Sequence, residues 1–199
     1  MTLTVREAVP ADLAALPAIE LSGDAMFAEL GIVFPPGPAA VETAIARGAS
    51  IVVAGDPPVA FAAVITLDGH PHLEQISVRA DRTRSGIGSL LLASVVREYG
   101  PGLTLLTFRD VPWNGPWYAR HGFAELPGSE WGPELRRHWQ AEIDEGLHAL
   151  GPRLVMYSRA HSCGDLVGHV ARADAHSLVA GRAAASAARR LNSLSVPLG

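Results

Sequence analysis

The spacing of hydrophobic residues along the first 158 positions changes between a period of two, typical of strands, and a period near 3.6, typical of helices. Seven short runs show the strand pattern and are rich in Val, Ile, Leu and Phe. Turn-forming residues bound several of them, such as the DPP segment between the second and third runs. The predicted strands are TLTVREA, SIVVAG, VAFAAVITLDG, HPHLEQISV, LTLLTFR, FAEL and RLVMYS, which begin at residues 2, 50, 59, 70, 103, 123 and 153.

Helical spacing fills most of the gaps between these runs. The first helix is predicted at 12–20, with Asp12 as its N-cap residue. Residues 22–38 are apolar but interrupted by Gly and Pro, which predicts a mobile lid or loop. The order of the elements predicts a mixed sheet with helices on its faces rather than a regular βαβ alternation. Further helices are predicted at 39–47, 86–99, 113–122 and 133–149.

The composition changes after Ser158. The chain has 199 residues, of which 48% are hydrophobic, and it can therefore bury a sizeable core. Residues 159–199 are instead rich in Ala, Ser, Arg and Gly and contain no aromatic residue. We expect one domain at 1–158 and a C-terminal extension at 159–199 that is helical or disordered. Deletion of the extension is expected to leave ligand binding intact, because the motifs that carry chemistry lie upstream.

Charge and residue usage exclude several classes of function. A net charge of −4 and a pI near 6.0 argue against a nucleic-acid-binding protein. All 16 basic residues are arginine, so a P-loop nucleotidase, which needs a lysine in its phosphate loop, is excluded. The single cysteine, Cys163, allows no intrachain disulfide and indicates a reducing compartment. The first residues lack a signal-peptide pattern and no run of about 18 apolar residues occurs, so we expect a cytoplasmic protein that does not span a membrane.

A strand, a loop and a helix meet in the stretch ISVRADRTRSGIGSLLL, residues 76–92. The N-terminus of a helix exposes unpaired N–H groups and carries a partial positive charge. Gly86 and Gly88 let a ligand approach the backbone, and Arg82 and Arg84 add charge, so the stretch is typical of a diphosphate site. A dinucleotide-binding fold would need a third glycine where this sequence has leucine. The remaining alternative is an ordinary turn with solvated arginines.

This stretch resembles motif A of the GCN5-related N-acetyltransferases, the GNAT superfamily. In that motif the amides of an Arg/Gln-x-x-Gly-x-Gly/Ala loop hold the pyrophosphate of acetyl-coenzyme A. The glycines match Gly86 and Gly88, whereas Thr83 stands where the family usually has Arg or Gln. The stretch LLTFRDVPWNGPWYARHGFAE resembles motif B of the same family, in the right order and separation. The residues that match motif B are Asn114, Tyr118, Gly122 and Phe123.

The resemblance, which covers about residues 2–158, implies an α+β fold. Its sheet is mixed and mostly antiparallel, with about seven strands, helices on both sides, and a splay between the fourth and fifth strands. Acetyl-coenzyme A would lie in the splay, with its pantetheine arm on the fourth strand. For Asn114, capping of a helix is an equal alternative to a cofactor contact. The residues expected to bind the cofactor are Ile76, Ser77, Val78, Thr83, Arg84, Ser85, Gly86, Ile87, Gly88, Ser89 and Asn114.

Acetyl transfer to an amine requires removal of a proton from the amine, polarisation of the thioester and protonation of the departing thiolate. The resemblance implies that Tyr118 is the general acid near the sulfur. Glu74 is the candidate base, because strict strand alternation places it on the face of Ile76 and Val78, where partial desolvation would raise its pKa. His72, one step earlier on that face, and a chain of waters are alternatives.

The sequence thus predicts an acetyl-coenzyme-A-dependent N-acetyltransferase that acts on an amine of a small molecule or peptide by direct transfer in a ternary complex. The alternative is a non-catalytic acyl-coenzyme-A-binding regulatory module. Neither nucleic acid nor a membrane is expected as a partner, and a homodimer is left open. No metal site is expected, because His70 and His72 have no cysteine nearby. Residues 22–38 and 126–140 are expected to set acceptor specificity, with the later helix as a solvated rim.

Overall fold

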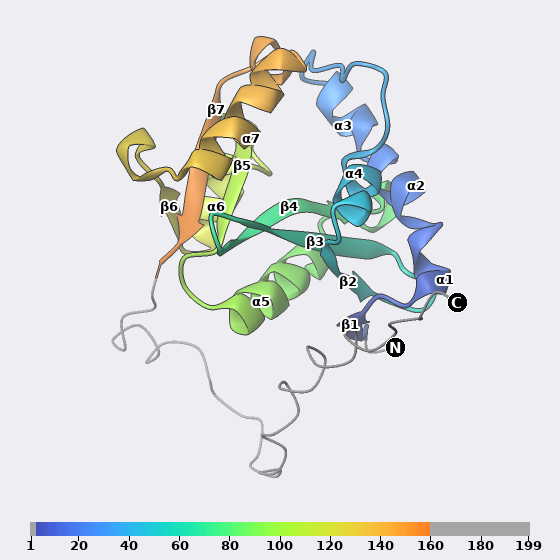
Figure 1. The fold of residues 1–199 in the computed structure, drawn as a ribbon. Coiled ribbons are helices and arrows are strands. Elements are labelled where there is room, and N and C mark those ends of the chain that lie inside the picture. The colour runs from blue at the N-terminus through green and yellow to red at the C-terminus, as the bar shows by residue number, and fades with distance from the viewer. Residues whose placement is uncertain (1–2, 160–199) are drawn as a thin grey trace, which may run out of the picture. The chain divides into compact units, whose positions relative to one another are not determined.

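Seven strands form one mixed sheet in the order β1-β2-β3-β4-β5-β7-β6 (Figure 1). The computed structural model describes residues 3–159 of the chain. All neighbouring strands are antiparallel except β4 and β5, which run parallel. The sequence-predicted strands all form, and the predicted fold class is confirmed. The strands are β1 (Val5–Glu7), β2 (Ser50–Ala54), β3 (Ala60–Leu67), β4 (His70–Val78), β5 (Thr104–Phe108), β6 (Phe123–Glu125) and β7 (Arg153–Ser158).

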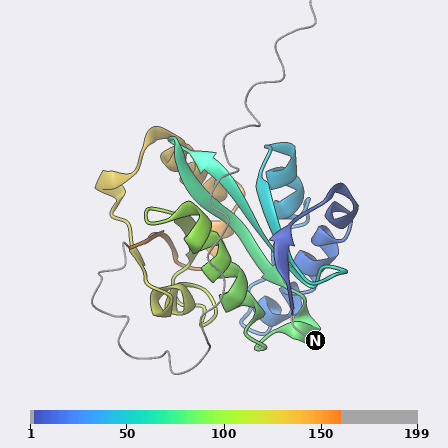
Figure 2. The same ribbon diagram turned by 90° about the horizontal axis from the view of Figure 1, so that it is seen from below.

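Helices cover both faces of this sheet. α5 and α6 pack on one face, and α2, α4 and α7 pack on the other. In Figure 2 the green α5 and the blue N-terminal helices lie on opposite sides of the central strands. The helices within the described residues are α1 (Pro10–Leu13), α2 (Leu16–Leu21), α3 (Asp24–Ala28), α4 (Ala40–Ala46), α5 (Ile87–Tyr99), α6 (Gly115–Arg120) and α7 (Pro133–Asp144), with 3₁₀ turns at Ala80–Arg82, Gly128–Glu130 and Leu147–Leu150.

Alternation along β3 builds both layers of the core. Phe61, Ala63 and Ile65 are buried against α2, α4 and α7. Ala62 and Val64 point the other way and are buried against α5 and α6. A strand that is covered on both faces needs apolar residues at every position, which explains the unbroken hydrophobic run of β3.

A β-bulge interrupts β4 at Glu74, because Leu73 and Gln75 pair with two consecutive residues of β3. The extra residue shifts the alternation of side chains by one position. Ile76 and Val78 therefore pack toward α5, whereas Glu74 lies on the opposite face, beside α4 and α7. The expectation that Glu74 shares a face with Ile76 and Val78 is wrong, since regular alternation takes no account of a bulge.

β4 and β5 separate soon after they pair. Two register pairs join them, His72 with Thr104 and Leu73 with Leu105. Residues 75–78 of β4 remain paired with β3 on one side and have no partner on β5. The predicted splay between the fourth and fifth strands is therefore confirmed, and it opens directly at the bulge.

The first helical region differs in detail from the prediction. The helix predicted at 12–20 is divided into α1 and α2, and residues 22–38, predicted as a lid or loop, contain α3. Asp12 is the third residue of α1 rather than its N-cap. Its carboxylate accepts the Val9 N–H at 2.8 Å and pairs with Arg6 at 2.6 Å, so it stabilises the helix from within the first turn.

The C-terminal part of the domain also differs from the prediction in extent. The helix predicted at 133–149 ends at Asp144, because Gly146 turns the chain with φ +82 into a 3₁₀ turn. Residues 160–199, most of the predicted C-terminal extension, lie outside the described residues. Within residues 3–159, none of the helices combines the length and the apolar character needed to cross a membrane.

Candidate functional site

The loop between β4 and α5 ends in a helix terminus that no side chain caps. Gly86 occupies the N-cap position with φ +82, and α5 begins at the next residue. The first hydrogen bond of the helix runs from the Leu90 N–H to the Gly86 carbonyl. The N–H groups of residues 87–89 therefore have no acceptor within the helix. These amides and the positive end of the helix dipole together favour an anion at this position.

The side chains of Arg82, Thr83 and Arg84 in this loop differ in their contacts. Arg82 lies 3.5 Å from Asp81, whereas Arg84 is exposed and has no ion pair among the described residues. Arg84 has φ +58, unusual for a residue other than glycine, and precedes the turn into α5. Thr83 donates its hydroxyl to the Ala80 carbonyl at 3.0 Å, so it turns into the loop. Arg84 is thus the better placed of these residues to add charge for a ligand.

Gly88 and Ser89 lie where α5 meets α6. A Cβ on Gly88 would lie 3.6 Å from Trp117 and from Val78, an ordinary contact, so packing within the protein does not require glycine there. The Ser89 hydroxyl lies 2.9 Å from Nε2 of His121, whose Nδ1 lies 2.8 Å from the Trp117 carbonyl. Because a carbonyl only accepts, Nδ1 carries a proton and donates it to the Trp117 carbonyl, while Nε2 contacts the Ser89 hydroxyl. Sequence reasoning missed this link, which ties α6 to the first turn of α5.

Asn114 occupies the N-cap position of α6, but its side chain does not cap the helix. Its Nδ2 donates instead to Thr107 on β5, at 2.7 Å. Its Oδ1 is buried without a hydrogen-bond partner among the described residues. The helix-capping alternative is therefore wrong, and Asn114 offers an unused acceptor beside the part of β5 that has left β4.

Tyr118 lies in the core between the sheet and α6. Its side chain is 7% exposed and its ring packs near Trp117 and Phe123, at centroid distances of 4.9 and 5.6 Å. Burial raises the pKa of its phenol above the ordinary value of 10.0. The hydroxyl therefore keeps its proton at neutral pH and is available as a hydrogen-bond donor.

Glu74 lies in a cluster formed with Arg47, His72 and His138, hereafter the Glu74 cluster. Its Oε1 lies 3.7 Å from the guanidinium of Arg47, at the end of α4, and its Oε2 lies 3.1 Å from Nε2 of His138 on α7. The side chains of Glu74 and His138 are 10% and 16% exposed. Sequence reasoning missed Arg47 and His138, although His138 follows the buried Leu135 at helical spacing, a signal that it faces inward.

The charges of this cluster control the pKa of Glu74. Burial by itself raises that pKa, but the contact with His138, together with the nearby positive charge of Arg47, more than offsets it. The net effect lowers the pKa of Glu74 from its ordinary value of 4.5, so the carboxylate is ionised at neutral pH. The predicted rise is therefore wrong, because the positive charge of Arg47 and the contact with His138 come from α4 and α7 and not from neighbours in the sequence.

His72 is 1% exposed and its Nδ1 lies 2.8 Å from the Thr104 hydroxyl. Its ring meets that of His138 edge-on, with 5.2 Å between centroids. Burial lowers the pKa of His72 to about 3, so the ring is neutral and weakly basic at neutral pH. Of the two side chains considered as a base, the structure therefore favours Glu74 over His72.

α7 reaches Glu74 because the hairpin turn between β3 and β4 holds its N-terminus. Asp68 and Gly69 form a two-residue turn with φ +53 and +76. The Asp68 carboxylate accepts the N–H groups of Glu134 and Leu135 at 2.8 and 3.0 Å, and Glu134 accepts the Asp68 N–H in return. A Cβ on Gly132 would lie 2.3 Å from that carboxylate, so only glycine allows this approach.

His72, Glu74 and His138 are also of the residue types that bind divalent metals. One donor atom from each lies within 4.8 Å of the others. The guanidinium of Arg47 already balances the carboxylate charge. A divalent cation would add charge that these side chains do not compensate, so the cluster is better described as an ion-pair network.

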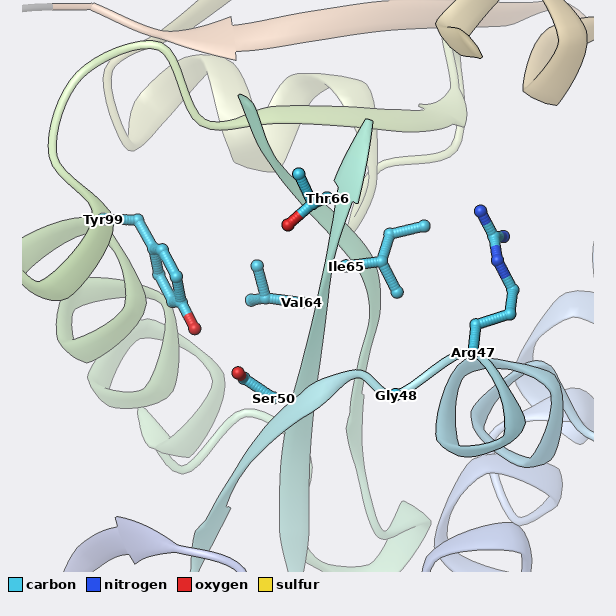
Figure 3. A pocket seen from close by; sticks show the side chains of 7 residues that line it. All are labelled: Arg47, Gly48, Ser50, Val64, Ile65, Thr66 and Tyr99. Atoms are coloured by element: carbon cyan, nitrogen blue, oxygen red, sulfur yellow. The ribbon is translucent and has the colours of Figure 1, made fainter. Parts of the chain in front are cut away.

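A cavity of about 190 Å³ lies beside residues 64–66 of β3, next to the N-terminal end of β2 (Figure 3). Figure 3 shows Tyr99 and Arg47 approaching it from opposite sides of β3. None of the residues predicted to bind the cofactor lines it, so it is separate from the predicted coenzyme site. The lining residues are Arg47, Gly48, Ser50, Val64, Ile65, Thr66 and Tyr99.

Comparison with known proteins supports the same interpretation of the fold. Residues 47–125 match the family model of the acetyltransferase (GNAT) domain. The structure is similar to that of an acetyltransferase of the GNAT family from Staphylococcus aureus Mu50, with a TM-score of 0.59, 16% identity, and coverage of 79% of this chain and 98% of that one. It is also similar to the PaiA N-acetyltransferase from Thermoplasma acidophilum in complex with coenzyme A, with a TM-score of 0.54, 14% identity, and coverage of 80% and 99%.

A third similar structure is N-acetylglutamate synthase from Neisseria gonorrhoeae, complexed with coenzyme A and N-acetyl-glutamate. The TM-score is 0.57 at 20% identity and 81% of this chain is covered, but this chain spans only 36% of that protein. The family match includes both loops that resemble the family motifs, and the sheet has the predicted splay. Residues 47–125 therefore match the GNAT acetyltransferase domain, which supports the resemblance carried by the two sequence motifs, and the fold is similar to that of solved GNAT structures.

Proposed function

We propose that this protein transfers the acetyl group of acetyl-coenzyme A directly to an amine of a small molecule or peptide, within a ternary complex. One observation carries the proposal. The uncapped N-terminus of α5 and the splay between β4 and β5 are joined by a single short loop, residues 79–86. A diphosphate held at the helix terminus would place the attached pantetheine arm along the part of β4 that lacks a β5 partner.

In this proposal the diphosphate is bound by the amides at the start of α5, with Gly86 and Gly88 allowing its approach. Arg84, Ser85, Ile87 and Ser89 lie on the same turn, and Thr83 contributes only through the backbone of the loop. The pantetheine arm and the thioester carbonyl bond to the backbone of residues 76–78, and Asn114 uses its unpaired Oδ1. Solved GNAT folds that contain coenzyme A support acetyl-coenzyme A as the cosubstrate.

The chemistry is divided between the two faces of the sheet. Tyr118, on the α5 face, keeps its proton at neutral pH because burial raises its pKa, and it donates that proton to the departing thiolate. Ionised Glu74, on the opposite face at the mouth of the splay, draws the proton away from the incoming ammonium. A water chain from this carboxylate remains compatible with the same role.

The proposal is tested by measuring coenzyme A binding calorimetrically and thiol release from acetyl-coenzyme A across a broad panel of amines. Tyr118→Phe is expected to lower kcat by about 100-fold while the Kd of coenzyme A stays nearly constant. Binding without turnover on any amine, and no effect of Tyr118→Phe, would favour the non-catalytic acyl-coenzyme-A-binding module. Absence of coenzyme A binding would contradict both functions.

A further inference from the structure

α7 brings an imidazole to the carboxylate that the proposed function uses. His138 lies on the inward face of the helix, one turn from the clamp formed by Asp68. Unlike His72, which is 1% exposed, its side chain retains contact with solvent. It therefore connects the buried carboxylate of Glu74 with the outside of the protein.

Glu74 by itself is a weak proton acceptor. Its pKa is lowered despite its burial, and the guanidinium of Arg47, 3.7 Å from Oε1, stabilises its charge. A carboxylate of this kind holds and polarises a neighbouring imidazole more readily than it keeps a proton. The catalytic aspartate of serine hydrolases acts on its histidine in the same manner.

The geometry also indicates which of the two ring nitrogens of His138 carries the proton. Nε2 of His138 lies 3.1 Å from Glu74 Oε2, an ionised oxygen that can only accept, so Nε2 carries a proton. The pair does not meet full hydrogen-bond geometry, and Oε2 has no other partner among the described residues. Such contacts in a ligand-free site commonly tighten when substrate binds. In the neutral ring, Nδ1 is left as the acceptor.

We propose that Glu74 and His138 form a carboxylate–imidazole dyad, in which Glu74 positions the ring and Nδ1 of His138 takes the proton from the acceptor ammonium. This inference rests on the proposed acetyl transfer. His138 is then the general base, directly or through one water, and Glu74 is a positioning residue. The acceptor must accordingly enter from the side of the sheet covered by α4 and α7.

The proposed step balances in protons and electrons. The nitrogen of the ammonium gives one proton to His138, and its lone pair then forms the C–N bond to the thioester carbon. The C–S bond breaks, its electron pair stays on sulfur, and Tyr118 protonates the thiolate. The second proton lost by nitrogen restores Tyr118, and His138 releases its proton to solvent. The net products are the amide, free coenzyme A and one proton.

The remaining charged groups of the cluster favour this direction of transfer. Arg47 faces Glu74 from α4 and keeps the carboxylate ionised, so the proton stays on the imidazole. His72 faces both groups from β4 but is neutral because its pKa is about 3. A base that acts only in its neutral form is lost when it is protonated, so the dyad predicts an acidic limb of the pH–rate profile that depends on His138.

The first experiment compares wild type, His138→Asn and the matched control His70→Asn, which lies exposed at the start of β4. With an amine found active in the panel, His138→Asn is expected to lower kcat by about 100-fold, with the KM for acetyl-coenzyme A unchanged. The acidic limb should disappear in this variant and persist in His70→Asn. Wild-type kcat and an unchanged limb in a folded His138→Asn protein would overturn the dyad but leave the acetyltransferase proposal standing.

A second measurement needs no turnover and separates failure of the dyad from failure of the proposed function. Long-range ¹H–¹⁵N spectra of the full chain report the tautomer of each histidine, with His138→Asn assigning the signal. The dyad predicts that neutral His138 is protonated on Nε2, whereas a proton on Nδ1 would overturn it. In the activity assay, imidazole added to His138→Ala should restore part of the lost kcat, and failure of rescue in the folded variant would count against His138 as the base.

Discussion

The loop before α5 and the Glu74 cluster belong to opposite faces of one sheet, and they are built from different kinds of contact. Most side-chain contacts of the loop join residues one to three positions apart, such as Thr83 with Ala80; the Ala80 N–H, which donates to the Ser22 hydroxyl, is an exception. The contacts of the cluster join β4 to α4, β5 and α7; the bond from His72 to Thr104 spans 32 positions. The loop offers backbone amides, whereas the cluster offers side chains.

This difference determines how each region responds to change. A site made of amides depends on local backbone conformation, so it tolerates many side chains but few changes at glycine. A site made of side chains that are distant in the sequence depends on the helices and strands that carry them. A mutation outside the site can therefore displace its side chains. Mutations can therefore separate coenzyme A binding from catalysis.

The largest effect is expected from Gly86→Val, which disrupts the backbone of the loop before α5. Gly86 has φ +82, and a β-branched residue there strains the turn and displaces the amides of α5. The Kd of coenzyme A should rise on the order of 100-fold. Gly102→Val is the control, since Gly102 has φ +89 with open space around it but lies beyond the other end of α5. A comparable loss of affinity in the control would mean that strain, not the amide site, causes the effect.

Asp68→Ala tests the Glu74 cluster, because Asp68 holds the N-terminus of α7. It removes both acceptors from the N-terminus of α7, which should lower the free energy of unfolding by about 1 kcal/mol. Because His138 loses its fixed position, kcat should fall about tenfold while the Kd of coenzyme A does not change. Asp68→Asn keeps one acceptor oxygen and a residue that tolerates positive φ, so it should lie between wild type and Asp68→Ala. Parallel loss of coenzyme A affinity would show that the two faces are coupled.

The buried ring of His72 predicts how the stability of the cluster depends on pH. Its folded pKa of about 3 lies below the ordinary value of 6.5, so the unfolded chain binds the proton first as the pH falls. The stabilisation is complete above pH 6.5 and is lost between pH 6.5 and about 3. The slope from this one group reaches at most about 1.4 kcal/mol per pH unit. Chemical unfolding at several pH values should show a shallower loss in His72→Asn, and an identical slope in that variant would contradict the assignment.

The smallest effect is expected from Thr83→Arg, which adds a positive charge to the loop before α5. The family usually has Arg or Gln there, and here the hydroxyl only bonds to the loop backbone. An added guanidinium should tighten coenzyme A binding by about threefold at low salt, and less at high salt. Ala93→Arg adds the same charge to the exposed middle of α5 and should leave the Kd unchanged. Equal tightening by both variants would mean that net charge alone is responsible.

Local sequence determined most of the fold and the side of the sheet where we propose that the cofactor binds. The apolar runs predicted all seven strands, and the splay followed from the family motifs. The loop before α5 could be identified because an anion site of this kind needs only glycines and a helix start, which lie together in the sequence. Asp12 and residues 22–38 were less predictable, because short helices depend on packing rather than on propensity.

Tertiary structure alone decided the surroundings of Glu74, on the side where we propose that the acceptor binds. Regular alternation placed Glu74 on the wrong face because a β-bulge has no reliable sequence signal, and the bulge turns the side chain toward α4 and α7. Those helices supply Arg47 and His138, which reverse the shift that burial imposes on the pKa of Glu74. Charges act through space, so residues far apart in the chain set the chemistry of this carboxylate. The helical spacing of His138 after Leu135 shows that the residue faces inward, but it does not show that Glu74 lies opposite.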